Sequence, residues 1–190
     1  MEKEILKYLS KYVPITDEIE SAIKESAFIK SFKKGTILLK KGDISNECYL
    51  ILKGCIRSYY EKDGDEKTIE FYTEEQAVTP SSYGKKIASE HYLECTEDTI
   101  ASVGSPESEI EIFRKFPQLE SVARVMGEVI MSKYQESFAE FKLTSPEERY
   151  LNLLKHRPDL LQRAPQYQIA SYLGIKPESL SRIRKRIDKK

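Results

Sequence analysis

The stretch QYQIASYLGIKPESLSRIRKRI, residues 166–187, decides how the C-terminal part of the chain folds. Its pattern is that of two short helices joined by a tight turn at Gly174, where a residue without a Cβ can adopt a left-handed conformation. Ala170 is small at the point where two helices must approach closely, and Pro177 suits the first turn of the second helix. The apolar side chains expected to be buried are Ile169, Leu173, Ile175, Leu180 and Ile183. Together these features predict a helix-turn-helix, whose second helix enters the major groove of DNA.

The second helix has a polar face opposite its apolar one. On this face, Arg182 can donate two hydrogen bonds to a guanine edge, and Glu178 can accept one from a cytosine amino group. The other candidates for DNA contact are Ser181 and, as residues that touch phosphates, Gln166, Tyr167, Ser179 and Lys185. The alternative is an ordinary helical hairpin whose polar face is merely solvated.

Charge is distributed unevenly along the chain, although its formal net charge is zero. Residues 144–190 contain 11 Lys or Arg and 5 Asp or Glu, whereas the remainder contains 20 and 26. This asymmetry indicates a basic module that meets a polyanion, carried by an acidic body. A solvated basic tail is the alternative explanation.

The region from Ala27 to Val103 has the pattern of a β-sheet protein. Short β-branched and aromatic runs alternate with turn residues, and the Asp63-Gly64 pair is a strong hairpin signal. The runs cover residues 28–32, 36–39, 48–53, 55–60, 67–72, 91–95 and 99–103. Many short strands at nearly even spacing predict a sandwich or jelly roll.

Helical patterns flank this β-rich region on both sides. Residues 1–25 have apolar side chains at helical spacing, and Thr16 resembles a helix start. After Pro106 the pattern predicts one helix at 107–116 and a longer one from 117 to about 141.

The longer helix has an apolar stripe that suits contact with another helix. Its members are Leu119, Val122, Met126, Val129 and Ile130, continued by Tyr134, Phe138 and Phe141. We interpret the stripe as a homodimer contact, and the alternative is packing against its own domain. After it, Ser145 and Pro146 predict the start of a further helix.

Several functional classes are disfavoured by the sequence. No apolar run approaches the roughly 20 residues that span a bilayer, and the charged N-terminus lacks the apolar core of a signal peptide, so we expect a cytoplasmic protein. Cys48, Cys55 and Cys95 fit a reducing compartment and lack metal-ligand spacing. His91 and His156 lie far apart, and no phosphate loop or nucleophile elbow occurs. We therefore expect no enzyme activity, no metal and no cofactor.

Residues 177–182, PESLSR, resemble the recognition helix of the Crp/Fnr regulators, the family of the cyclic-AMP receptor protein. Residues 49–54 and the Gly42-Asp43 pair resemble a strand and turns of the same family. The resemblance covers nearly the whole chain and implies an α+β fold. It also implies a homodimer that binds double-stranded DNA and reads its bases with Glu178 and Arg182. The implied parts are a cyclic-nucleotide-binding-like jelly-roll sensor domain at 1–116, a dimerisation helix at 117–143 and a helix-turn-helix domain at 144–190.

One segment departs from the family. Residues 80–91 match its nucleotide-binding cassette but contain neither the Gly-Glu pair nor the arginine that holds the cyclic phosphate, and Glu90 or His91 falls near the arginine position. Because an acidic group there repels a phosphate, we do not expect regulation by a cyclic nucleotide. The sequence therefore predicts a sequence-specific transcription regulator with an unknown small-molecule effector. The alternative is a ligand-binding or protein-interaction module with a vestigial helix-turn-helix.

Overall fold

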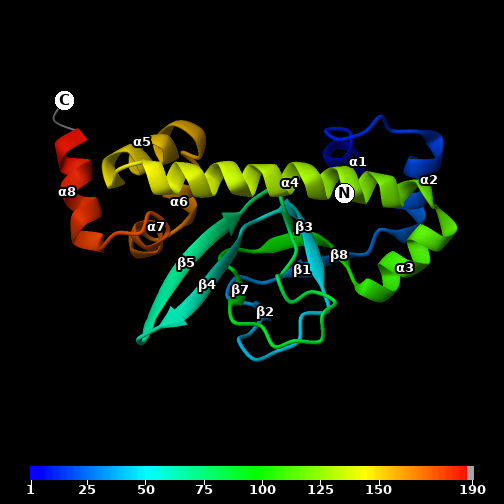
Figure 1. Ribbon diagram of the computed structural model, residues 1–190, viewed down its shortest axis with the longest axis horizontal. Coiled ribbons are helices and arrows are strands. Elements are labelled where there is room, and N and C mark those ends of the chain that lie inside the picture. The colour runs from blue at the N-terminus through cyan, green and yellow to red at the C-terminus, as the bar shows by residue number, and fades with distance from the viewer. Residues whose placement is uncertain (188–190) are drawn as a thin grey trace.

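The computed structural model describes residues 1–187 and is shown in Figure 1. The chain begins with two short helices, α1 (Glu2–Leu9) and α2 (Asp17–Ser26). The Thr16 hydroxyl oxygen accepts a hydrogen bond from the backbone N–H of Ile19 at 3.3 Å and so caps α2. The predicted helical segment at 1–25 and the start at Thr16 are confirmed.

The middle of the chain forms two four-stranded antiparallel sheets, which we call the β-roll. The strand orders are β1-β8-β3-β6 and β2-β7-β4-β5. The strands are β1 (Ile29–Phe32), β2 (Ile37–Leu39), β3 (Cys48–Lys53), β4 (Ile56–Lys62), β5 (Asp65–Tyr72), β6 (Ala77–Val78), β7 (Tyr92–Cys95) and β8 (Thr99–Gly104). Each predicted run contains a strand, so the jelly-roll prediction is confirmed, and the two-residue strand β6 was not predicted.

The core of the β-roll lies between the two sheets, and side chains from both of them fill it. Its buried members are Leu39, Tyr49, Ile51, Ile56, Val78, Leu93, Cys95, Ala101 and Val103. The β4–β5 hairpin turns at Asp63 (φ 55°) and Gly64 (φ 81°). Two successive positive φ angles suit a tight hairpin turn, as the Asp-Gly pair predicted.

The helix α3 (Pro106–Lys115) leads into the long helix α4 (Gln118–Leu143), which crosses the molecule in Figure 1. Leu119 and Val122 on α4 are buried in a cluster with residues of α1 and α2. From Met131 to its end, every residue of α4 is exposed. The first half of the helix therefore packs against its own domain, whereas the second half is more exposed and touches the rest of the chain through contacts such as the 3.1 Å hydrogen bond between the hydroxyls of Tyr134 and Tyr72.

The C-terminal region consists of α5 (Pro146–His156), α6 (Leu160–Arg163), α7 (Gln166–Tyr172) and α8 (Pro177–Ile187). A capping box begins α5, because the Ser145 hydroxyl accepts from the N–H of Glu148 at 3.3 Å while the Glu148 carboxylate accepts from the N–H of Ser145 at 2.7 Å. This confirms the predicted helix start. The single-turn helix α6 was not predicted.

The C-terminal helices pack against β5, which lies at the edge of its sheet. The rings of Phe71 on β5 and Tyr172 on α7 meet edge to face, with centroids 5.6 Å apart. Phe71 also belongs to the same buried cluster as Leu153 and Leu160. The helix-turn-helix region therefore shares a core with the β-roll and covers a strand edge that would otherwise be open to solvent.

Candidate nucleic-acid interface

The turn between α7 and α8 is built around Gly174, whose φ is +70°. Its N–H donates to Ser171 O at 2.9 Å, and the N–H of Ile175 donates to Ala170 O at 3.0 Å. This pair of bonds is the Schellman pattern, which ends a helix in a left-handed residue. A Cβ at this position would lie only 2.9 Å from Cζ of Phe141. Backbone conformation and space both require glycine, as the sequence indicated.

The apolar side of the helix-turn-helix is packed as predicted. Ile169, Leu173, Leu180 and Ile183 are buried, and Ile175 is partly buried against them. Ala170, the small residue before the turn, is fully buried. This packing fixes the side of α8 that faces the protein, and therefore the side that faces outward.

The outward side of α8 carries side chains predicted to contact DNA. Glu178, Ser181, Arg182 and Lys185 are exposed, and Ser179 is half-buried. Nε of Arg182 donates to the carbonyl oxygen of Glu178 at 3.3 Å. Because residues four apart lie on one face of a helix, Glu178 and Arg182 can reach neighbouring bases.

The two remaining candidates lie at the start of α7. Gln166 is exposed, and Tyr167 is 57% exposed. The Tyr167 hydroxyl accepts a hydrogen bond from the Gln168 side-chain amide at 3.3 Å. All seven candidate residues thus belong to the two helices of one motif, and six of them are exposed.

The last turn of α8 is strongly basic, with Arg184, Lys185 and Arg186 in sequence. Lys185 is exposed, whereas Arg186 forms an ion pair with Glu147 at the start of α5. A cation near a helix C-terminus is favoured by the helix dipole and is also available to a phosphate.

The loop between β6 and β7 is the segment predicted from the sequence to correspond to a nucleotide-binding cassette. Lys85, Lys86 and Glu90 are exposed there. His91 is buried, and burial lowers its pKa, which favours the neutral imidazole. Residues 79–91 contain no arginine, and the two lysines of this loop are exposed.

A buried arginine occurs elsewhere in the β-roll, on β4. The side chain of Arg57 is 2% exposed, and its Nη2 contacts carboxylates of Glu66 at 2.6 Å and Glu94 at 2.7 Å. Its guanidinium carbon lies 4.0 Å from the ring centroid of Tyr59. The guanidinium of Arg57 is therefore already engaged by two carboxylates and an aromatic ring.

A cavity of about 740 Å³ lies between β5, α4, α5 and α7. Aromatic side chains form much of its wall, including Tyr72, Tyr134, Phe138 and Phe141, and Arg149 adds a cation. Its volume lies in the range of small-molecule sites. The sequence did not reveal this cavity, because its walls come from segments far apart in the chain.

The cysteines show no sign of a metal site. Cys55 and Cys95 are fully buried and Cys48 is half-buried. Burial raises the pKa of each of these thiols, which makes the metal-binding thiolate less accessible. Across residues 1–187, no group of His, Cys, Asp and Glu side chains could hold a metal ion.

Comparison with known proteins gives the family context of this geometry. Residues 29–102 match the family model of the cyclic nucleotide-binding domain. The chain is similar in structure to the catabolite activator protein of Thermus thermophilus, at 18% identity and a TM-score of 0.57, covering 96% of this chain and 87% of that chain. No curated protein sequence matches the chain closely.

Two further solved structures are similar to the chain. The c-di-GMP-responsive global regulator CLP of Xanthomonas campestris gives 15% identity and a TM-score of 0.67, covering 89% of this chain and 90% of that chain. FixK2 of Bradyrhizobium japonicum gives 18% identity and a TM-score of 0.67, covering 86% and 85%. Within residues 1–187, no helix is long and apolar enough to cross a membrane. Residues 29–102 are therefore similar to the cyclic nucleotide-binding domain family, in a chain that has the fold of the Crp/Fnr-type regulators.

Proposed function

We propose that this protein is a cytoplasmic, sequence-specific DNA-binding transcription regulator that acts as a homodimer and does not catalyse a reaction. The observation that carries the proposal is the exposed face of α8, where Glu178, Ser181 and Arg182 stand out from a helix whose other side is buried. A rigid helix with this division of faces suits insertion into the major groove.

The candidate contacts divide into two kinds. Arg182 donates to a guanine edge and Glu178 accepts from a cytosine amino group, and both contacts discriminate between bases. Ser181 lies on the same face. The contacts proposed to touch phosphates and to set the register without reading sequence are those of Gln166, Tyr167, Ser179 and Lys185.

The exposed half of α4 supports pairing of two copies within residues 117–143. Met131 is 60% exposed and Phe138 is 65% exposed, and Tyr134 and Phe141 are exposed between and beyond them. Their 3-4-3 spacing is that of a helix that packs against a second helix. Burying the parts of these side chains that remain exposed against the partner α4 removes apolar surface from water, which favours the dimer.

We also propose that the regulator does not respond to a cyclic nucleotide. The cassette loop offers exposed lysines and Glu90 where a phosphate would need an enclosed cation. The aromatic cavity beside α4 supports a different small ligand. It also favours the second candidate function, a ligand-binding module without DNA recognition.

Selection from a random pool of DNA with purified protein at fixed salt tests the proposal. We expect a two-fold symmetric motif that is lost in Arg182→Ala. Arg114→Ala, a change of the same charge at an exposed position on α3, is the control and should select the wild-type motif. Binding that depends on salt but not on sequence in all three proteins would instead support the ligand-binding module.

A further inference from the structure

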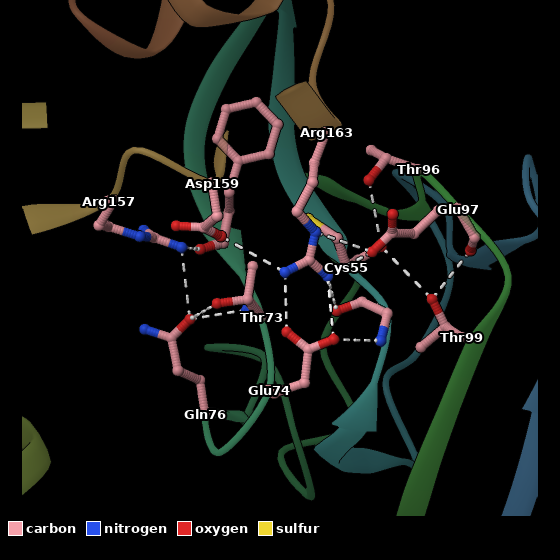
Figure 2. A network of polar contacts seen from close by, with 12 residues as sticks. Cys55, Thr73, Glu74, Gln76, Thr96, Glu97, Thr99, Arg157, Asp159 and Arg163 are labelled. Atoms are coloured by element: carbon pink, nitrogen blue, oxygen red, sulfur yellow. Dashed lines mark hydrogen bonds and ion pairs between the residues drawn. The ribbon is translucent and has the colours of Figure 1, made fainter. Parts of the chain in front are cut away.

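Arg163, the last residue of α6, joins the helix-turn-helix region to three turns of the β-roll (Figure 2). Its Nη2 donates to Gly54 O at 2.7 Å, and its Nη1 contacts Glu74 Oε2 at 2.8 Å. Its Nε donates to Glu97 Oε1 at 3.0 Å. The three acceptors lie in the β3–β4, β5–β6 and β7–β8 turns, so a single guanidinium holds three separate points of the β-roll.

Arg157, at the end of α5, makes a second attachment. Its Nη1 contacts Glu70 Oε1 at 2.8 Å, and its Nη2 donates to Phe71 O at 2.6 Å. In Figure 2, Arg157 lies near Gln76, and Arg163 lies near Glu74 and Glu97. Both side chains are about one-fifth exposed, at 21% for Arg157 and 19% for Arg163. The contacts are therefore partly shielded from water, unlike ordinary surface ion pairs.

A third contact involves α7 itself. The backbone N–H of Thr68 on the edge strand β5 donates to the Ser171 hydroxyl oxygen at 2.9 Å, and that hydroxyl donates to Glu66 O at 3.2 Å. Only Ala164 and Pro165 separate Arg163 from α7, and proline restricts the backbone between them. Because this connection is short, we expect Arg163 and α7 to move together, and α8 to follow through the tight turn.

We propose that Arg157 and Arg163 act as positioning residues for DNA recognition. Together with their acceptors they form an interdomain clasp that fixes α8 relative to the β-roll and, in the dimer, sets the separation of the two recognition helices. This inference rests on the proposed function, because the separation matters only if two copies of α8 meet successive major grooves, about 34 Å apart.

The test combines a readout with DNA and one without it. Affinities are measured for a series of symmetric sites whose half-sites are moved apart one base pair at a time, and for an isolated half-site. Wild type is expected to bind the site with one half-site spacing about tenfold more tightly than sites with adjacent spacings. In Arg163→Gln this preference should fall to at most about threefold. The affinity of the variant for the isolated half-site should change by less than about twofold. Arg163→Lys, which keeps the charge but not the planar fork, should be intermediate. Lys33→Gln, which removes an exposed ion pair with Asp98, is the matched control.

Hydrogen exchange of the DNA-free proteins provides the second readout. In Arg163→Gln, the Thr68 amide and the rest of β5 should exchange faster, while β3 in the core keeps its protection, which separates release of the clasp from unfolding. Faster exchange with an unchanged spacing preference would overturn the positioning role, as would unchanged exchange and spacing together. Absence of any specific DNA binding by wild type, with faster exchange in the variant, would refute the proposed function and the positioning role but not the clasp as a docking contact.

Discussion

Phe141 near the end of α4 lies directly against Gly174 in the turn of the helix-turn-helix, and a Cβ at Gly174 would come within 2.9 Å of the phenyl ring. The same ring lies 4.5 Å from the guanidinium carbon of Arg149. Nε of Arg149 in turn donates to Leu173 O at 3.0 Å. The long helix α4 thus contacts the turn that orients α8. No pattern in the sequence indicates this contact between α4 and the α7–α8 turn.

Substitution of the turn glycine should be costly. Gly174→Ala is expected to lower the free energy of unfolding by about 2–4 kcal/mol, because a left-handed conformation and an overpacked contact both disfavour a side chain. Urea unfolding measures the loss. Gly35→Ala is the control, since Gly35 also has a positive φ but no atom within 4 Å of an added Cβ. An equal loss in the two variants would show that the contact with Phe141 has no cost.

The buried arginine of the β-roll should contribute strongly to stability. Arg57→Met removes the cation between Glu66 and Glu94 and leaves both carboxylates without it, so we expect a loss of about 2–4 kcal/mol in the free energy of unfolding. The exposed pair of Lys33 and Asp98 provides the comparison, and Lys33→Met should cause no measurable loss. A stable Arg57→Met protein would mean that the arginine is not structural.

Stability should depend on pH through His91. Burial lowers the pKa of His91 below its ordinary value of 6.5 in the folded protein. At pH values between the lowered pKa and 6.5, the unfolded chain then binds more protons than the folded chain. The contribution of neutral His91 to the free energy of unfolding is therefore present above pH 6.5 and is lost as the pH falls through that window. The urea midpoint of His91→Gln should consequently fall less than that of wild type on acidification.

The dimer contact can be tested by placing a charge on the apolar face of α4. Phe138→Glu should shift the protein toward the monomer in sedimentation equilibrium by about tenfold or more in the dissociation constant, because a carboxylate would be buried between apolar side chains. Ala139→Glu puts the same charge on the next residue, which points away from the stripe, and should leave the dimer intact. Equal weakening by both would indicate a different interface.

Local chemistry accounts for what the sequence predicted correctly. The Thr16 cap, the Asp63-Gly64 hairpin and the glycine turn at 174 each depend on a few neighbouring residues, and the structure has all three. The strand β6 and the helix α6 were missed because each is very short and is held in place by distant partners. The packing of α7 against β5 was missed because it too depends on residues that are far apart in the sequence. No local pattern indicates that Arg163 meets Glu74 and Glu97, because these residues are far apart in the sequence.

The central claim, base reading by α8, is tested most directly by fluorescence anisotropy with the selected site and with sites altered symmetrically at one base pair. Wild type should discriminate against a change of the guanine contacted by Arg182 by about 1–3 kcal/mol. Arg182→Ala should lose that discrimination at this base pair alone and keep it at the others. An equal loss of affinity of Arg182→Ala for every sequence would contradict the account, because Arg182 would then contact only the phosphate backbone.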